Sequence, residues 1–155
     1  MDVIIKRATI ENLKDIQELN NKLFELEYEK FDPALKVGWP FGTDGTEYFC
    51  DMLNNEVVFI AFVDNKIVGY LAGCINLNLS YIIKSLAEID NMFILEEYRD
   101  QGIGTKLINE FREYCLKFGI QEIKVGANAK NINAINFYRK NGFDDFEIIL
   151  KTQLN

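Results

Sequence analysis

The chain of 155 residues is 48% hydrophobic and 26% charged, a balance that fits one globular domain with its own core. Its net charge of −7 comes from 17 Lys and Arg against 24 Asp and Glu, which disfavours nucleic acid or an anionic membrane as the main partner. Histidine is absent, so catalytic triads, imidazole zinc sites and histidine general bases are excluded. Small cationic molecules and basic peptides are the ligands that this charge favours.

The amino-terminal residues and the cysteines both indicate the cytoplasm. Residues 1–6 run straight into a strand-like pattern without a basic and apolar leader. No apolar run approaches the ~20 residues that a membrane helix needs. Cys50, Cys74 and Cys115 are odd in number and widely spaced, so we expect free thiols in a reducing compartment.

The first third of the chain predicts a strand, two helices and an irregular loop. Ile4–Ala8 reads as a strand, and apolar residues at helical spacing follow Thr9, which can cap a helix. Prolines, glycines and aromatic residues break the pattern between 31 and 43. A short second helix is predicted from Asp44 to Leu53.

The rest of the chain predicts further strands interleaved with two helices. Val57–Val63 and Ile67–Ile75 should form a hairpin around 64–66, followed by a strand at 86–95. A long helix stopped by Gly119, a strand at 123–127, a short helix at 133–140 and a last strand at 143–150 complete the order. We therefore predict a mixed α/β sheet with helices on both faces.

Residues 97–107 predict a phosphate-binding turn. They lie where a strand ends and the long helix begins, so free N–H groups and the positive end of the helix dipole point out of the turn. Gly102 and Gly104 lack Cβ atoms and let a diphosphate approach, while Arg99 adds a positive charge and Thr105 a hydroxyl. The alternative is a helix start that merely contains two glycines, although each costs about 1 kcal/mol against alanine.

Two common phosphate motifs do not match this turn. A Walker loop needs Gly at position 99 and Lys followed by Ser or Thr after the second glycine, whereas the chain has Arg99 and the order Thr105-Lys106. A dinucleotide fingerprint needs a small residue at position 107, which is leucine. A nucleoside-triphosphate switch is therefore a weak alternative.

A second segment beyond the turn completes a known pattern. The motif Asn-x-x-Ala-x-x-Phe-Tyr, followed by Gly-Phe, is matched by Asn131, Ala134, Phe137, Tyr138, Gly142 and Phe143. The motif Arg/Gln-x-x-Gly-x-Gly/Ala is matched by Arg99, Gly102 and Gly104. With the element order, which fits over essentially the whole chain, these motifs resemble the Gcn5-related N-acetyltransferase (GNAT) superfamily. The resemblance implies one acetyltransferase domain over 1–155 and a mostly antiparallel sheet splayed between its fourth and fifth strands.

The resemblance implies acetyl-CoA as the acyl donor and no metal. The backbone of Met92, Phe93 and Ile94 would pair with the pantetheine arm, and a bulge in that strand would offer an N–H to the thioester carbonyl. The other implied cofactor contacts are Arg99, Asp100, Gln101, Gly102, Ile103, Gly104, Thr105, Asn131, Ala134 and Tyr138.

Transfer to an amine needs a base, because an alkyl amine with a pKa near ~10.4 is almost wholly charged at neutral pH. Glu88 and Asp90 lie in the strand before the glycine turn. Period-two alternation puts them on the face of Met92 and Ile94 unless the bulge resets the parity. The resemblance favours Glu88 as base and Asp90 as the charge partner of the substrate; solvent-facing carboxylates and a water-only route are the alternatives. Tyr138 is the expected acid, or else a residue that only packs.

Carboxylates and aromatic residues are mixed between 25 and 44, where the resemblance places substrate recognition. The expected contacts are Glu27, Tyr28, Trp39 and Phe41. This mixture suits an ammonium group through charge and cation–π contact, although an exposed acidic helix end over core aromatics has the same composition. We expect a cationic primary amine: a polyamine, an aminoglycoside, an amino acid, or a lysine or amino terminus of a protein.

The expected function is N-acetylation by direct attack in a ternary complex, carried out by a monomer or homodimer in the cytoplasm. The alternative is a catalytically inactive domain that binds acyl-CoA as a sensor or interaction module. Tyr138 and the two strand carboxylates favour the enzyme.

Overall fold

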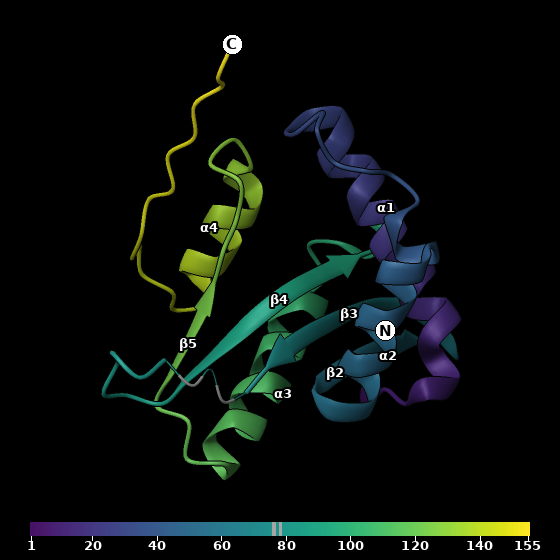
Figure 1. The fold of residues 1–155 in the computed structure, drawn as a ribbon. Coiled ribbons are helices and arrows are strands. Elements are labelled where there is room, and N and C mark those ends of the chain that lie inside the picture. Colours follow the sequence, from purple (N-terminus) through teal and green to yellow (C-terminus); the bar gives the residue numbers. More distant parts are fainter. Residues whose placement is uncertain (76, 78) are drawn as a thin grey trace.

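The computed structural model describes residues 1–75, 77 and 79–155, and within these ranges the strands form one sheet in the order β1-β2-β3-β4-β5 (Figure 1). The strands are β1 (Val3–Arg7), β2 (Val57–Val63), β3 (Lys66–Cys74), β4 (Leu86–Ile94) and β5 (Glu122–Val125). The helices are α1 (Leu13–Lys30), α2 (Thr43–Asn55), α3 (Ile103–Lys117) and α4 (Ile132–Lys140), with 3-10 turns at Ile10–Asn12, Trp39–Phe41 and Glu96–Tyr98. All neighbouring strands are antiparallel except β4 and β5, which are parallel.

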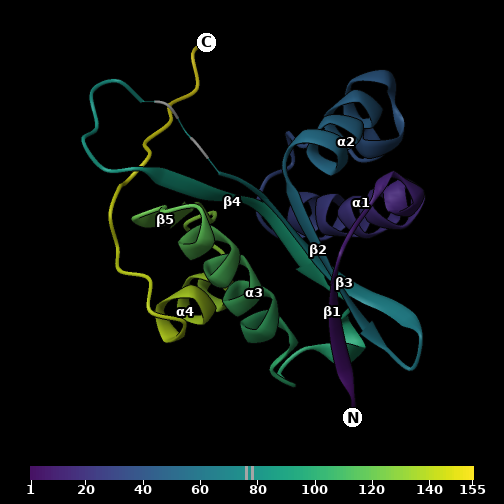
Figure 2. The same cartoon turned by 90° about the horizontal axis from the view of Figure 1, so that it is seen from below.

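Helices cover both faces of this mixed, mostly antiparallel sheet, which is the predicted fold class (Figure 2). The α3-side core includes Val57, Phe59, Leu71, Ile89, Leu107 and Phe111. The α1/α2-side core includes Ile16, Phe49, Val58, Ile60, Tyr70 and Phe93. Because successive residues of β2 enter opposite cores, β2 reads as a continuous apolar run rather than an alternating one.

The predicted hairpin and helix boundaries agree with the structure to within a few residues. Asp64 and Asn65 both have positive φ, at 50° and 63°, as a two-residue hairpin turn of this hand requires. Thr9 caps the 3-10 turn that precedes α1, where its hydroxyl oxygen accepts from the Glu11 N–H. Gly119, with a φ of 70°, follows the end of α3. No helix within the described ranges combines the length and apolar character needed to cross a bilayer.

A β-bulge interrupts β4 at Asp90. In the ladder with β3, Ala72 lies opposite Asn91 and Gly73 lies opposite Ile89, so Asp90 has no partner. The extra residue shifts the alternation of side chains by one from this point onward. The bulge implied by the resemblance is therefore present.

The bulge also resets the side-chain parity of β4, which is the exception that the sequence analysis left open. Met92 and Ile94 pack against the α3-side core, whereas Asp90 contacts Tyr48 of α2 and Phe93 lies in the α1/α2-side core. The carboxylates of β4 thus lie on the opposite face from Met92, because uninterrupted period-two alternation does not survive an inserted residue.

The sheet opens beyond the bulge. β4 and β5 pair from Leu86 opposite Glu122 to Ile89 opposite Val125. β4 then continues to Ile94 without β5 beside it. This divergence confirms the predicted splay between the fourth and fifth strands and leaves backbone groups of β4 exposed on one side.

The predicted last strand at 143–150 is wrong: residues 143–155 have no regular secondary structure. Gly142 turns the chain with a φ of 87°, and Asp145 then accepts two hydrogen bonds from Arg139 of α4, at 2.8 and 2.6 Å. The segment is held to α4 and does not lie along the edge of β5, so its apolar residues lack the neighbouring strand that would complete a ladder.

Gly45 allows α2 to contact the 3-10 turn at Trp39–Phe41. A Cβ at Gly45 would lie 2.6 Å from the Cα of Pro40, and this clash with backbone atoms could be relieved only by moving the 3-10 turn or α2. Alanine normally stabilises a helix by about 1 kcal/mol relative to glycine, but overpacking here should cost ~1–3 kcal/mol.

We therefore expect Gly45→Ala to lower Tm by about 2–10 °C in a thermal melt. The matched control is Gly126→Ala, because a Cβ at Gly126 meets nothing within 4 Å. A Tm that rises in Gly45→Ala would contradict the close contact.

Candidate active site

A chain of polar side chains holds the Asp90 carboxylate. The hydroxyl of Tyr48 on α2 donates to Asp90 Oδ2. The Asn91 amide joins this pair to the sheet: its Nδ2 donates to the Tyr48 oxygen at 2.9 Å, and its Oδ1 accepts from the Tyr70 hydroxyl at 2.6 Å. The bulge directs Asp90 and Asn91 to the same face, so one phenol can contact both.

The inner end of this chain is Asn20 on α1. Its Nδ2 donates to the Tyr70 oxygen at 2.8 Å, and the side chain is 2% exposed. The Asn20 Oδ1 has no hydrogen-bond partner among the described residues, so it can accept one further donor. Burial raises the pKa of Tyr70 and of Tyr48, which keeps both phenols neutral and able to donate.

No sequence pattern predicts the hydrogen-bonded set of Asn20, Tyr48, Tyr70 and Asn91. Tyr70 lies in an apolar strand and Tyr48 in a short helix, where each aromatic residue has the spacing of an ordinary core residue. Only packing of α1 and α2 on the sheet brings them together with Asn91.

Glu88, the predicted base, is paired with a cation. Its Oε2 lies 3.3 Å from Lys124 Nζ, which β5 places directly opposite in the ladder. Both side chains are partly exposed. The pair lies at the closed end of the opening, on the same face of β4 as Asp90.

Tyr138, the predicted acid, lies on α4 between two aromatic rings. Its ring centroid is 5.3 Å from that of Phe137 and 5.7 Å from that of Phe143. Burial raises the pKa of Tyr138 to about 12, and the charge of Glu27 adds to the shift. The phenol is therefore protonated at neutral pH and can act as a donor.

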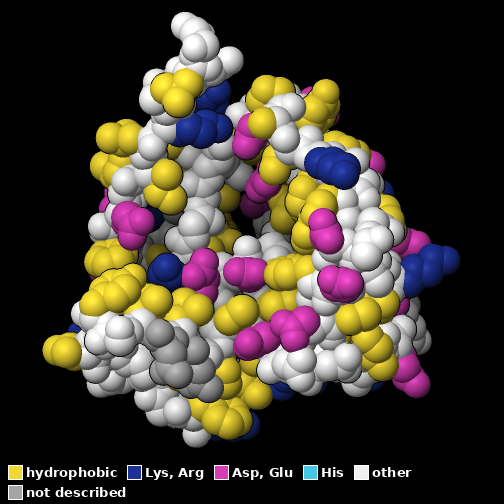
Figure 3. Space-filling model, in the orientation of Figure 1, with side chains coloured by type: hydrophobic (Ala, Val, Ile, Leu, Met, Phe, Trp, Pro, Cys, Tyr) yellow, Lys and Arg dark blue, Asp and Glu magenta, His cyan; other side chains and the backbone are white. Residues whose placement is uncertain are grey.

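Glu27, a predicted substrate contact, faces the same opening from α1. Burial raises its pKa, with a smaller contribution from Asp32. Its charge acts on both Tyr70 and Tyr138, so groups from α1, β3 and α4 converge. Figure 3 shows a hollow between the α4 and α1 sides of the molecule, with acidic side chains around it.

The glycine turn presents an anion-binding backbone at the start of α3. Asp100 and Gly102 have φ values of 59° and 81°, and no side chain caps the helix. The first N–H groups of α3, at Ile103, Gly104 and Thr105, precede the first intrahelical acceptor and point out of the turn. A Cβ at Gly102 would meet nothing within 4 Å, so the space before the turn is open. These features fit a diphosphate.

Arg99 and Gln101 also stabilise the turn internally. Arg99 Nε donates to the Ile94 carbonyl at 2.8 Å, and its guanidinium lies 5.1 Å from the centroid of Phe93. Gln101 Nε2 donates to the Glu97 carbonyl at 3.0 Å. Arg99 thus ties the end of β4 to the turn while it brings a positive charge there.

Two predicted cofactor contacts have a different local role. A Cβ at Gly104 would lie 2.7 Å from Phe137 Cζ and 3.1 Å from Met92 Cε, so glycine is needed here for the packing of α4 against α3. Asn131 Oδ1 accepts from the Ala134 N–H at 3.1 Å and caps α4. Both residues position the elements around the opening.

The predicted substrate aromatics differ in their environment. Trp39 stacks on Phe24 with 5.7 Å between centroids and lies equally far from Tyr48. Tyr28 and Phe41 are exposed. Beside Trp39 is a hollow of about 270 Å3, lined by Lys36, Gly38, Trp39, Gly42, Thr43 and Asp44.

We expect Tyr48→Phe to lower the free energy of unfolding by ~1–2 kcal/mol in urea denaturation, because Asn91 Nδ2 and Asp90 each lose a partner. The control is Tyr81→Phe, at a side chain that is 81% exposed. Equal losses in the two variants would show that the Tyr48 hydroxyl contributes nothing to the fold.

The family comparison covers most of the chain. The model of the acetyltransferase (GNAT) family matches residues 14–143. An uncharacterised N-acetyltransferase of Methanocaldococcus jannaschii, MJ1207, is 34% identical over 149 residues, which are 94% of this chain and 62% of that protein. The chain therefore spans less than two thirds of the length of this relative.

Two further proteins extend the likeness. A spermidine N(1)-acetyltransferase of Thermoplasma acidophilum is 25% identical over 150 residues, covering 92% of this chain and 89% of that protein. The crystal structure of an aminoglycoside acetyltransferase, meta-AAC0020, from an uncultured soil metagenomic sample superposes with a TM-score of 0.72 at 26% identity, covering 99% of this chain and 95% of that one. With its splayed sheet, glycine turn and matching family model, the chain belongs to the GNAT family of acetyltransferases.

Proposed function

We propose that the chain transfers an acetyl group from acetyl-CoA to the nitrogen of a cationic primary amine. The observation that carries the proposal is the convergence, at one opening of the sheet, of an anion-binding turn, a partly buried neutral phenol and several carboxylates. Membership of the GNAT family supports it. So do the relatives named for spermidine and aminoglycosides, both of which are polycationic amines.

The glycine turn would hold the diphosphate of the cofactor. The N–H groups of Ile103, Gly104 and Thr105 would donate to its oxygens, with Arg99 as the nearby charge. The exposed backbone of β4 at Met92–Ile94 would pair with the pantetheine arm as an added strand. When bound, acetyl-CoA supplies an acyl group activated as a thioester.

Two side chains would move the protons of the reaction, and a third would position the amine. Glu88 would accept the proton of the incoming ammonium, and Asp90, oriented by Tyr48, would attract that ammonium to the bulge. As the new N–C bond forms and the C–S bond breaks, Tyr138 would donate its phenolic proton to the sulfur, and the second proton lost by the nitrogen would return through water to the Tyr138 phenolate. This scheme uses no metal, because the backbone N–H at the bulge would polarise the thioester carbonyl.

The amine would enter between α1, α2 and β4. Glu27 faces the opening from α1, and Trp39 packs against the phenol that holds Asp90. Tyr28 and Phe41 would complete the wall with exposed rings. Each charge contact at such a partly exposed site is worth only ~1 kcal/mol, so selectivity would come from several acting together.

The test of this function is acetyl-CoA turnover with a panel of polyamines, aminoglycosides, amino acids and lysine peptides, set against neutral and anionic amines of similar size. We expect the best substrate to be cationic, and its KM to rise with salt as screening over about 8 Å weakens the longer contacts. A neutral or anionic best substrate would refute the charge argument. Binding of acetyl-CoA without turnover of any amine would favour a sensor.

Cofactor binding can be tested without turnover. Acetyl-CoA at 100 times its Kd should stabilise the fold by ~2.7 kcal/mol, a Tm rise of about 5–10 °C. Thr105→Glu places a negative charge on an exposed residue of the first turn of α3 and should reduce this shift strongly. Asn109→Glu, one turn further along and also exposed, is the charge-matched control and should keep it. An unchanged shift in Thr105→Glu would place the diphosphate elsewhere.

Tyr138→Phe keeps the ring packing and removes the proton. The variant should lose ~10²-fold or more in kcat while KM for acetyl-CoA barely changes. Because burial raises the pKa of Tyr138 to about 12, the wild-type phenol should stay protonated through pH 10, with no loss of kcat from this group between pH 8 and 10. Wild-type kcat in Tyr138→Phe would assign the residue to packing alone.

A further inference from the structure

The ion pair of Lys124 with Glu88 differs from the other lysine–carboxylate pairs. Three such pairs form within the described residues, and this one is the shortest, at 3.3 Å against 3.8 Å for Lys66 and 3.7 Å for Lys84. It is also the least exposed: the Lys124 side chain is 40% exposed, whereas those of Lys66 and Lys84 are 56% and 54% exposed. A resident ammonium group thus lies against the carboxylate that would take the proton of the acceptor amine.

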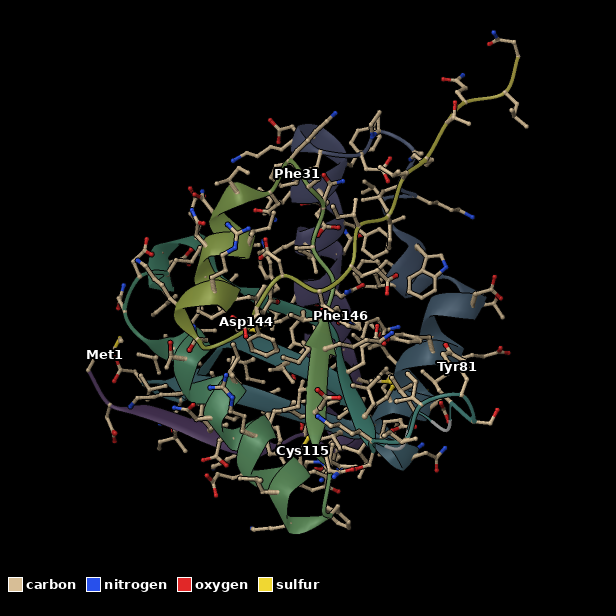
Figure 4. The ribbon with its side chains drawn as sticks, turned by 90° about the vertical axis from the view of Figure 1, so that its left-hand side faces the viewer. Met1, Phe31, Tyr81, Cys115, Asp144 and Phe146 are labelled. Atoms are coloured by element: carbon tan, nitrogen blue, oxygen red, sulfur yellow. The ribbon has the colours of Figure 1, made fainter. Side chains whose placement is uncertain are left out.

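The backbone of β5 directs Lys124 toward the side from which the amine would enter. Its neighbours Ile123 and Val125 pack against the α3-side core, so alternation turns Lys124 to the opposite face of the strand. In Figure 4, β5 lies in front, with α3 and α4 to its left and α2 to its right. The face of Lys124 is therefore the α1/α2 side of the sheet, where it meets Glu88.

Lys124 also lies close to the point where the sheet opens. The ladder between β4 and β5 ends one residue later, with Val125 opposite Ile89, and the bulge follows at Asp90. Two residues of a strand rise by ~7 Å, so the bulge lies about that far along β4 from Glu88. Lysine has a flexible four-carbon stem, which lets Nζ leave Glu88 and swing toward the bulge. The thioester carbonyl would lie at that point.

We propose that the chain acetylates its own Lys124, with bound acetyl-CoA as the donor. This inference rests on the proposed function, because it uses the same cofactor site and the same two proton-transfer groups. Lys124 is an amine that is already in contact with the base before any acceptor arrives.

The atoms and charges of this step balance. Glu88 takes one proton from the Lys124 ammonium, and the free amine attacks the carbonyl carbon of the thioester. As the N–C bond forms and the C–S bond breaks, the departing sulfur takes the phenolic proton of Tyr138. The second proton lost by the nitrogen returns through water to the Tyr138 phenolate, and Glu88 releases its proton to solvent. The products are N-acetylated Lys124, coenzyme A as the thiol, and one proton.

The first test is the intact mass of the full chain incubated with acetyl-CoA and no added amine, followed by peptide mapping. We expect one acetyl group per chain, on Lys124. Lys84 is the internal control for chemical acetylation, because it also pairs with a carboxylate, at the start of β5, but is more exposed. It should react at least ~10²-fold more slowly, since no acid and base are assembled around it. Equal rates at Lys84 and Lys124 would overturn the proposal.

Dilution and competition separate self-acetylation from modification in solution. The first-order rate constant at Lys124 should not change when the protein is diluted, because the lysine lies in the opening of its own chain. Excess coenzyme A, which competes for the cofactor site, should slow the reaction at Lys124 and leave that at Lys84 unchanged. A rate constant that rises in proportion to protein concentration, or one that coenzyme A does not alter, would contradict the proposal.

A charge-preserving variant tests the site itself. Lys124→Arg should keep the ion pair with Glu88, because arginine stays charged, and should keep the rise in Tm with acetyl-CoA, but it should lose the acetyl group. Lys84→Arg is the matched control and should acquire the acetyl group at the wild-type rate. An acetyl group that persists in Lys124→Arg would place the modification on another residue and refute the assignment.

The amine panel, assayed on the same preparation, distinguishes failure of this inference from failure of the proposed function. Turnover of an amine while Lys124 stays unmodified would overturn the inference and leave the function standing. Acetylated Lys124 without turnover of any amine would support the inference and refute the proposed class of acceptor.

Discussion

The one-residue bulge at Asp90 is the constraint on which the rest of the site depends. It turns Asp90 and Asn91 to the same side of β4 and sends Met92 to the other. The ladder between β4 and β5 ends at Ile89, directly before this insertion, and the sheet opens from there. The bulge therefore lies where two features meet: the polar side chains of Asp90 and Asn91, which face α1 and α2, and the backbone edge of β4 that β5 leaves exposed.

The polar wall is stabilised by groups that are neutral except at its outer end. Asn20, Tyr70, Asn91 and Tyr48 pass hydrogen bonds in sequence to the Asp90 carboxylate. Burial raises the pKa of both phenols, so the charge of the chain is concentrated on Asp90, where it borders solvent. A buried polar group costs free energy unless it is satisfied, and this arrangement satisfies nearly all of them.

Much of the fold could be predicted from the sequence because hydrophobic periodicity and turn residues are local signals. The hairpin turn at Asp64-Asn65 and the glycine turn before α3 are examples. The side-chain parity of β4 could not be predicted, since a bulge depends on how two strands align. The contact of Tyr48 with Asp90 joins segments 42 residues apart, and no pattern encodes it. The predicted strand at 143–150 was wrong because apolar, β-branched composition favours a strand only where a neighbouring strand is available for pairing.

The contact of Gly104 with Phe137 has a mechanical consequence. Gly104 lies in the first turn of α3, and the Phe137 ring fills the space that a side chain there would need. Tyr138 is the next residue along α4. The amides that can hold an anion and the phenol that can donate a proton are therefore parts of one stiff unit, whose relative placement is set before any ligand arrives. Substitutions at Gly104 or Phe137 would shift the amides of the turn and the Tyr138 phenol together, even where the substituted side chain touches no ligand.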